Sequence, residues 1–179
     1  MLKNIRERFA KSFLRHQVQE LHRLPKQVNL ESARHIAFLY YLSDEETYKK
    51  VETIIEKFIN MKLIVRVLCY TDLKTIPHYF IPKLLQDIIT SNDVNWRYQP
   101  VKPFFKEFTQ TNFDILLDLS LSDHLPLTYC AALSKASLKI GRFDENHQML
   151  YDLMIHTSPE ETIESFTNQV IHYLTKINT

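Results

Sequence analysis

Glycine is almost absent from this sequence: Gly141 is the only one among 179 residues. The phosphate-binding loops of nucleotide-binding proteins, and the sharp turn that carries the nucleophile of α/β hydrolases, each need more than one glycine. Only glycine lets the backbone approach a ligand or a neighbouring chain so closely. The sequence therefore excludes a Walker loop, a GxGxxG dinucleotide loop and a nucleophile elbow.

Cysteine is scarce as well, and long apolar runs are missing. Cys69 and Cys130 lie far apart in the sequence with no metal-ligand spacing around either, so we expect two buried, reduced thiols. No apolar run approaches the roughly 18 residues that a membrane span needs. The charged N-terminus also lacks the apolar core of a secretory signal. These features indicate a cytoplasmic protein.

Metal-ligand patterns are weak. The eight histidines are scattered, and no two of them have HxH or HxxxH spacing. Asp144, Glu145 and His147 lie close together, but a loop of this composition is more often solvated than metal-bound. We therefore expect no metal and no cofactor.

The net charge is only +1, but the basic residues are concentrated at the N-terminus. Residues 1–26 carry a net charge of +5, and the rest of the chain carries −4. Such a basic segment either binds an anionic partner, for example RNA, lipid headgroups or an acidic protein surface, or lies on its own acidic domain. The candidate partner-binding residues of this segment are Lys3, Arg6, Arg8, Lys11 and Arg15.

Apolar residues in this segment recur every three to five positions from Leu2 to Leu24, with charged residues between them. This spacing predicts a basic amphipathic helix within residues 1–26 that ends at Pro25. Such a helix can dock on its own domain, associate with a second copy or lie on a membrane surface. We favour docking.

From residue 35 onward, apolar runs typical of buried strands alternate with amphipathic patterns. We expect strands over 35–42, 62–70, 113–119, 137–140 and 151–156, and a short strand over 93–98. The helical patterns cover 48–59, 101–109, 127–134 and 163–177, with a turn or two of helix over 84–89. This alternation predicts a single three-layer α/β domain over residues 30–179. We expect a Rossmann-like, doubly wound and mainly parallel sheet of five or six strands, in the order 3-2-1-4-5-6 or in the flavodoxin-like order.

Local signals predict how several elements begin and end. Ser43 and Glu46 have the spacing of a capping box, and Ser158 and Glu161 have the same spacing before the last helix. Gly141 follows a short predicted strand, so we expect it to adopt a positive φ in a turn.

Polar residues gather where several predicted strands end. In an open α/β sheet, ligands bind beyond the carboxyl ends of the strands, where the strand order reverses. Each of these residues also has a structural explanation, because Ser and Asp commonly cap helices, and a Ser–His–Asp composition shows no catalytic geometry by itself. The candidate ligand-binding residues are Thr71, Asp72, Asp118, Ser120, Ser122, Asp123 and His124.

Aromatic residues are frequent between residues 96 and 108. If they are exposed, Trp96, Arg97 and Tyr98 form a stacking platform for a partner such as single-stranded nucleic acid. The alternative is that these rings belong to the core, because aromatic residues at helical spacing usually pack inward. Burial distinguishes the two interpretations.

The segment FDILLDLSLSDHLPLTYCAALSKASLKIGRF, with YLSDEETYKKVETIIEKF and DVNWRYQPVKPF upstream, resembles a small uncharacterised bacterial α/β family, a domain of unknown function. The resemblance spans nearly the whole chain and implies the fold and a bacterial cytosolic setting, but no activity. The first segment is also distantly similar to the N-terminal Rossmann half of heptosyltransferase-like glycosyltransferases. This similarity rests on Asp114, Asp118, Ala131, Ala132, Ile140 and Gly141. The nucleotide-sugar domain and glycine-rich acceptor loop of those enzymes have no counterpart in these 179 residues, so the similarity implies shared architecture rather than shared catalysis.

From these patterns we expect a non-catalytic binding or adaptor module that acts through residues 1–26 and an aromatic surface. One alternative is a glycosyltransferase-like enzyme or binder of a nucleotide or sugar, with its site at the strand ends near residues 118–124 and an anion at a helix N-terminus. Another is association with RNA or the ribosome through residues 1–26 and 96–98. The sequence leaves the oligomeric state open.

Overall fold

The computed structural model describes residues 2–21 and 23–177, apart from the side chains of Leu2 and Lys3. Six parallel strands form one sheet in the order β3-β2-β1-β4-β5-β6. This confirms the predicted Rossmann-like, doubly wound arrangement, with the 3-2-1-4-5-6 order of the two that were predicted. The strands are β1 (His35–Tyr41), β2 (Ile64–Tyr70), β3 (Gln86–Ile89), β4 (Ile115–Asp118), β5 (Leu138–Arg142) and β6 (Leu153–Ile155).

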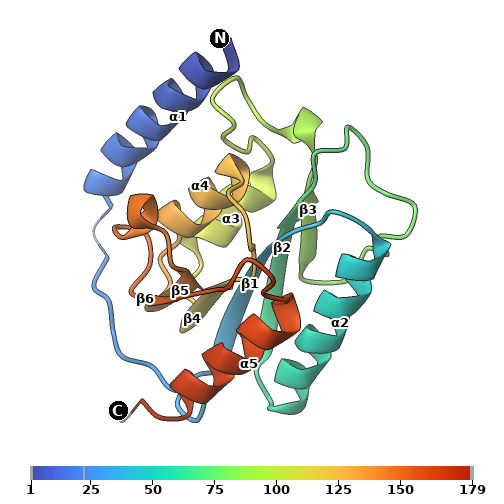
Figure 1. Ribbon diagram of the computed structural model, residues 1–179, viewed down its shortest axis with the longest axis vertical. Helices are drawn as coiled ribbons and strands as arrows, with labels where there is room; N and C mark the ends of the chain where they lie inside the picture. The colour runs from blue at the N-terminus through green and yellow to red at the C-terminus, as the bar shows by residue number, and fades with distance from the viewer. Residues whose placement is uncertain (1, 22, 178–179) are drawn as a thin grey trace.

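Helices cover both faces of the sheet (Figure 1). On one face, α2 (Glu45–Asn60) packs beside α5 (Ile163–Leu174), and on the other α3 (Pro103–Gln110) packs beside α4 (Leu125–Leu133). The N-terminal helix α1 (Leu2–Gln19) lies against the outer side of α4. The domain therefore has the three expected layers, with α1 added outside one of them.

The strands separate two apolar cores. In β1, Ile36, Phe38 and Tyr40 face α2 and α5, while Ala37 and Leu39 face α3 and α4. All five side chains are buried because successive residues of a strand point to opposite faces and both faces are covered. This explains why the sequence shows a continuous apolar run here instead of an alternating one.

The N-terminal helix docks on its own domain. Ala10 and Leu14 are buried, and the phenol of Tyr129 in α4 donates a hydrogen bond to the Ala10 carbonyl oxygen at 3.1 Å. The Arg97 guanidinium lies 4.2 Å from the centroid of the Phe13 ring. The buried stripe is narrow, since Phe9 on the same helix remains exposed.

The helix α1 ends at Gln19, well before Pro25. Arg23 forms an ion pair with Asp152, and the Lys26 N–H donates to the Ser137 carbonyl oxygen at 3.0 Å. These contacts hold the chain in an extended conformation along the edge of the domain. The helical spacing of the apolar residues therefore continues in the sequence beyond the helix itself.

Two predictions between residues 84 and 98 are wrong. Residues 86–89 form strand β3 instead of a helical turn, because pairing with β2 buries Ile88 and Ile89. Residues 93–98 do not form a strand. A 3₁₀ helix spans Ser91–Asp93, and the chain then turns back to an isolated antiparallel bridge between Val94 and Pro100.

Two predicted caps and the predicted glycine turn are also wrong. Asp44, next to Ser43, caps α2 by accepting a hydrogen bond from the Thr47 N–H at 2.8 Å. Thr162 caps α5 in place of Ser158, because it directly precedes the first helical residue. Gly141 does not have a positive φ. The chain needs a glycine here because a side chain would overlap with the Tyr151 ring.

Candidate functional site

The carboxyl ends of the strands lie at the upper edge of the sheet in Figure 1. The strand order reverses between β1 and β4, and two hollows open there. The hollow that we call the inner cleft is lined by Asp118, Ser120, Ser122, Arg142 and Tyr151. The hollow that we call the outer groove is lined by Glu7, Lys11, Tyr70, Tyr98 and Leu125. Both also share Asp123, His124, Thr128 and His147.

The two hollows differ in size. The inner cleft has room for about one water molecule. The outer groove contains about 770 Å³ of open space and the inner cleft about 300 Å³, with the part continuous with solvent included in both. Of these two hollows, only the outer groove has room for a ligand of the size of a sugar or nucleotide, and the inner cleft adjoins it.

Asp118 is the last residue of β4 and is buried in the inner cleft. Its Oδ2 accepts a hydrogen bond from the Tyr151 phenol at 2.6 Å, and its Oδ1 accepts from the Ser120 N–H at 2.9 Å. Burial raises the pKa of the Asp118 carboxyl, and the hydrogen bond from Tyr151 opposes this shift. Burial and the Asp118 charge raise the pKa of Tyr151, which therefore keeps its proton.

Gly141 allows Tyr151 to reach Asp118. A Cβ atom at this position would lie 2.7 Å from Cε1 and from Cζ of the Tyr151 ring. Atoms this close repel strongly, so any side chain here would displace the ring. The only glycine of the chain thus makes room for a partly buried aromatic side chain at the site.

Asp72 follows β2 and is held by two phenols. Tyr70 donates to its Oδ1 at 2.7 Å, and Tyr41 donates to its Oδ2 at 3.0 Å. Burial, followed by the hydrogen bond to Asp72, raises the pKa of Tyr41 to about 12, and the same causes raise the pKa of Tyr70. Both phenols stay protonated at neutral pH and occupy the two carboxylate oxygens.

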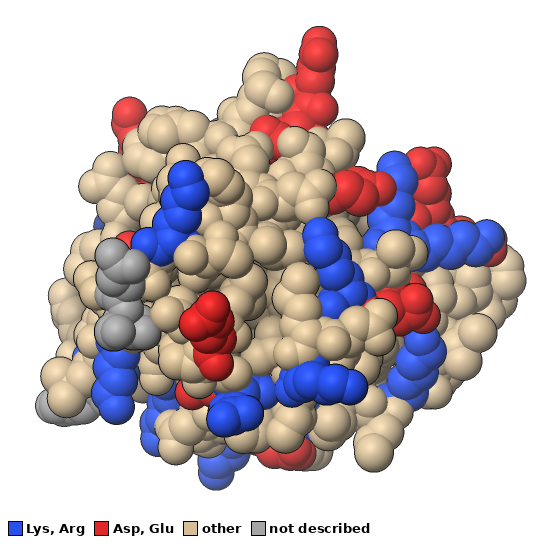
Figure 2. All heavy atoms as spheres, turned by 90° about the horizontal axis from the view of Figure 1, so that it is seen from below, with Lys and Arg blue, Asp and Glu red and all other residues tan. Residues whose placement is uncertain are grey.

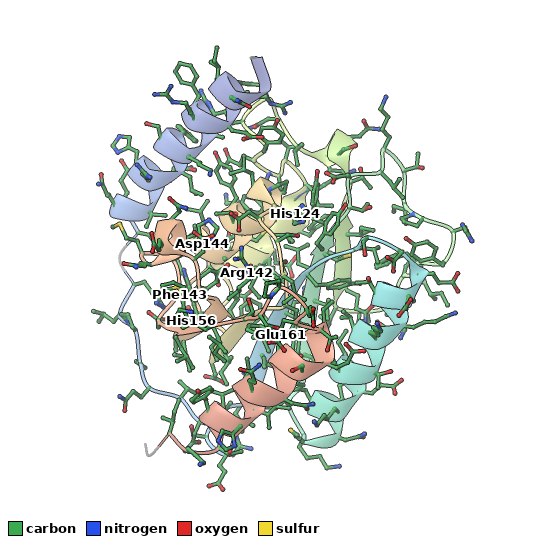
Figure 3. All side chains as sticks on the ribbon, viewed as in Figure 1. His124, Arg142, Phe143, Asp144, His156 and Glu161 are labelled. Carbon is green, nitrogen blue, oxygen red and sulfur yellow. The ribbon has the colours of Figure 1, made fainter. Side chains whose placement is uncertain are left out.

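Asp123 and Asp144 share the Arg142 guanidinium, which comes from the end of β5 (Figure 3). Arg142 lies 2.6 Å from Asp123 and 3.7 Å from Asp144, and His147 Nδ1 lies 3.7 Å from Asp123. Ligand atoms of Asp123, Asp144 and His147 all lie within 4.8 Å of one another, a spacing that suits a metal ion. However, the Arg142 guanidinium already pairs with both carboxylates and occupies the space between them, so we assign no metal here.

His124 precedes α4 and lies between the two hollows. Its ring stacks on Tyr41, with centroids 3.7 Å apart, and its Nε2 lies 2.9 Å from the Ser122 hydroxyl. Burial lowers the pKa of His124, although Asp72 and other carboxylates oppose this effect. The imidazole is therefore neutral at pH 7. Its Nδ1 has no hydrogen-bond partner within the described part of the chain.

The N-terminus of α4 has no side-chain cap. Within residues 2–21 and 23–177, no acceptor binds the N–H groups of Leu125 and Leu127. Free amides at a helix N-terminus favour an anion, because they carry the positive end of the helix dipole. The Ser120 hydroxyl, which lines the inner cleft, is also buried and makes no hydrogen bond of good geometry among the described residues, although it lies close enough to the Asp118 carboxylate to help lower its pKa.

At this edge of the sheet, the carboxylate acceptors already have hydrogen-bond or ion-pair partners, whereas several donors have none among the described residues. The carboxylates of Asp72, Asp118 and Asp123 are occupied by groups of the protein itself. The amides at the start of α4 and the Ser120 hydroxyl are unoccupied within the described residues. The arrangement suits a ligand that brings acceptors. The positive end of the α4 dipole favours an anion, while the charges of Glu7 and Asp72 in the outer groove oppose one.

The structure brings together all the predicted ligand-binding residues except Thr71. Asp72 lines the outer groove, and the five residues from 118 to 124 in that set line the inner cleft. Thr71 is buried below them, where its N–H donates to the Ile89 carbonyl oxygen at 2.9 Å. It supports the end of β2 and lines neither hollow.

Sequence reasoning missed Arg142 and Tyr151, and it considered His147 only as a weak metal ligand beside Asp144 and Glu145. The rule applied to the end of β4 also applies to β5, but the predicted strand stopped at residue 140, two positions before Arg142. Glu7 and Lys11 were not placed at this edge either, although Lys11 was a candidate partner-binding residue. No local signal identifies them as lining residues, because the docking position of α1 depends on tertiary contacts.

The remaining candidate partner-binding residues divide into two groups. Arg6 donates to the carbonyl oxygens of Asn95 and Trp96, and its guanidinium lies 3.7 Å from the centroid of the Tyr98 ring. Arg97 contacts the rings of Phe13 and Trp96. These residues join α1 to the 95–98 turn. Arg8 and Arg15 are exposed on α1, and the Lys3 side chain lies outside the described residues.

The opposite edge of the sheet, at the amino ends of the strands, faces the viewer in Figure 2. Lys and Arg side chains are spread over this surface, with Asp and Glu side chains between them. Basic charge is therefore not confined to α1.

Comparisons with curated proteins and with solved structures gave no match. Among the described residues, none of the helices has both the length and the apolar character needed to cross a membrane. A family model, described as a family of unknown function (DUF6913), matches residues 6–177. This match covers nearly the whole chain, so the protein belongs to the DUF6913 family of unknown function.

Proposed function

We propose that this protein binds a small anionic ligand, of the mononucleotide or sugar-phosphate class, at the carboxyl edge of its sheet. The observation that carries the proposal is the set of unoccupied donors there: the first amides of α4 and the buried Ser120 hydroxyl. An unsatisfied buried polar group costs about 1–3 kcal/mol, so a ligand that supplies an acceptor is favoured.

The anion lies in the outer groove against the start of α4, because the inner cleft is too small for a phosphate group. The Ser120 hydroxyl is reached through a water molecule in the inner cleft or by one oxygen of the ligand. His124 offers its Nδ1 at the boundary of the two hollows. This mode of binding uses a helix N-terminus and needs no glycine-rich loop.

The similarity to glycosyltransferases adds little to this proposal. Asp114 accepts hydrogen bonds from the N–H groups of Arg34 and His35 at 2.8 Å, at the amino end of the sheet. Gly141 makes room for Tyr151. Of the residues that carry the similarity, Asp118 lines the inner cleft, and its carboxylate is already occupied. We therefore propose binding and no transfer reaction.

Isothermal titration calorimetry of the full chain tests this proposal. The ligands are inorganic phosphate, nucleoside monophosphates and sugar phosphates. We expect saturable binding by at least one phosphate ester, weakened by Ser120→Ala about 2–10-fold, the loss of roughly one hydrogen bond. His124→Phe, which keeps a ring to stack on Tyr41 but removes the nitrogen atoms, is expected to weaken binding to a similar extent.

Matched control substitutions are available on the exposed side of α5, where Ser165→Ala and His172→Phe change the same residue types away from the groove. These variants should bind like the unaltered protein. The absence of heat with every phosphate compound at millimolar concentration would remove the proposal. An equal loss of affinity in the control variants would also contradict it.

A second candidate function is the binding of a protein partner through α1. Phe9 and Trp96 contact each other, with ring centroids 6.3 Å apart, and are nevertheless 59% and 55% exposed. Ile5 on the same helix is also exposed. Apolar residues that cluster on a surface in this way often mark an interaction site, which supports the expected adaptor function.

An affinity pull-down from lysate with the full chain tests this second candidate. We expect Phe9→Ser to lose a captured protein that Leu84→Ser, a change at another exposed apolar residue, retains. Equal capture by both variants would contradict an interface on α1. Capture of RNA with steep salt dependence would instead favour the nucleic-acid interpretation.

A further inference from the structure

One wall of the outer groove is formed by α1, which lies outside the sheet and the helices that cover it. Glu7 and Lys11, one helical turn apart on α1, line it together with Tyr98 from the 95–98 turn. Tyr70, Leu125 and Pro126 line the groove from the side of the sheet and α4. The groove therefore combines two tyrosine rings and apolar atoms with Glu7 and Lys11 from α1, in addition to Asp72, Asp123, His124 and His147 from the strand ends.

Tyr98 is held in this wall under backbone strain. Its φ is 63°, in the left-handed region that residues other than glycine rarely adopt. The strained turn is stabilised by Asn95, whose carbonyl oxygen accepts from the Tyr98 N–H at 3.0 Å and whose Oδ1 accepts from the Arg97 N–H at 2.8 Å. Strain of this kind is often found at ligand-binding positions.

The Tyr98 ring is also fixed from α1. The Arg6 guanidinium lies 3.7 Å from the ring centroid, and the same side chain donates to the carbonyl oxygens of Asn95 and Trp96. Tyr98 still lines the groove, so its ring is partly buried and held in place before any ligand arrives. A preorganised aromatic ring of this kind is suited to stack on a planar group.

Glu7 and Lys11 supply a hydrogen-bond acceptor and a donor beside these rings. In the described residues, neither side chain forms an ion pair or hydrogen bond within the protein. A planar group with both donors and acceptors on its edge fits such a pair, whereas a bare sugar offers no planar aromatic face to stack on Tyr98. Nucleobases have both an aromatic face and a polar edge.

We infer that the ligand of this groove is a nucleoside monophosphate, with its phosphate at the start of α4 and its base against Tyr98, Glu7 and Lys11. This inference rests on the proposed function and makes α1 part of the binding site. The base stacks on Tyr98, and the α1 side chains contact its polar edge. The residues of α1 determine which ligand is bound, while α4 binds the phosphate.

Titration calorimetry of the full chain with the four common ribonucleoside monophosphates and with ribose 5-phosphate tests the inference. At least one nucleotide is expected to bind about tenfold or more tightly than ribose 5-phosphate, the size of effect that one stacked base gives. Lys11→Met and Tyr98→Leu should reduce its affinity toward that of ribose 5-phosphate, whose own affinity should not change. Arg8→Met, an exposed change on α1 away from the groove, is the control.

Lys11 is exposed, so Lys11→Met does not endanger folding even if Tyr98→Leu disturbs the docking of α1. Equal affinity for nucleotides and ribose 5-phosphate, or unchanged nucleotide binding by Lys11→Met, would overturn the inference but leave the proposed function standing. If neither ribose 5-phosphate nor any nucleotide binds the unaltered protein, the proposed function fails and the inference fails with it.

Discussion

At the scale of single residues, the floor of the inner cleft depends on contacts between Gly141, Tyr151 and Asp118. The glycine leaves space for the tyrosine ring, and the tyrosine phenol binds the carboxylate at 2.6 Å. The Tyr151 hydroxyl and the Ser120 N–H then occupy both oxygens of Asp118, so that the buried carboxylate is not left unpaired.

Gly141→Ala is expected to destabilise the protein by about 1–3 kcal/mol, the usual cost of an overpacked site. The added methyl group would overlap with the Tyr151 ring, and chemical denaturation measures the resulting loss in the free energy of unfolding. The same substitution should cost much less in a Tyr151→Leu background. An equal cost in both backgrounds would show that the ring is not the reason for the glycine.

Lys139 is a second residue with an unusual environment. It is buried in β5, and its Nζ donates to the Ala132 carbonyl oxygen at 3.0 Å. Burial, reinforced by nearby Arg23 and opposed by Asp152, lowers the pKa of Lys139 to about 7. In the unfolded chain the pKa of a lysine is about 10.4, so between these values the unfolded state binds more protons.

The free energy of unfolding should therefore rise between pH 7 and pH 8, as folded Lys139 loses its proton while unfolded Lys139 keeps it. Lys139→Met should be more stable than the unaltered protein at pH 7 and should lack this rise. The urea midpoint at the two pH values measures both effects.

Above about pH 8.5 the free energy of unfolding should fall again. Burial raises the pKa of the Cys69 and Cys130 thiols, so they ionise there only in the unfolded chain. An identical slope in both proteins between pH 7 and pH 8 would contradict this account.

At the scale of elements, α1 is held by a few residues on one narrow side. Leu14 is 4% exposed and belongs to the core that contains α3 and α4, whereas Phe9, five positions before it, lies largely in solvent. One side of the helix is therefore packed on the domain, and the other side is exposed to solvent.

Leu14→Ala should lower the free energy of unfolding by about 2–4 kcal/mol, because it leaves a cavity between α1 and α4. Phe9→Ala should cost less than about 1 kcal/mol, since that ring is mostly exposed. Equilibrium denaturation of the two variants provides the comparison. A negligible effect of Leu14→Ala would mean that α1 is not docked in solution.

Elements with strong local signals could be predicted, and those that depend on distant partners could not. The continuous apolar run of β1 and the amphipathic face of α2 can be recognised from the sequence alone. The four residues of β3 do not, because only their pairing with β2 makes them a strand. The turn at 95–98 likewise depends on Asn95 and Arg6, residues that are far apart in the sequence.

At the scale of the whole molecule, the doubly wound order determines where a site can form. The alternation of strands and helices predicted this order as one of two alternatives, although it placed the third strand at residues 93–98, and it placed Asp118–His124 at the point where the order reverses. Tyr151 could not be predicted as a lining residue, since it precedes β6 and reaches the cleft only across Gly141. Glu7 and Lys11 come from the other end of the chain and reach the groove only because α1 docks.

The most direct test of the central claim is an NMR titration of the assigned backbone amides with inorganic phosphate and then with a nucleoside monophosphate. The account predicts saturable shifts of the Leu125 and Leu127 amides, because these N–H groups at the start of α4 have no acceptor among the described residues. Shifts confined to the amino-end surface in Figure 2, or no shift at the start of α4 at millimolar ligand, would contradict it.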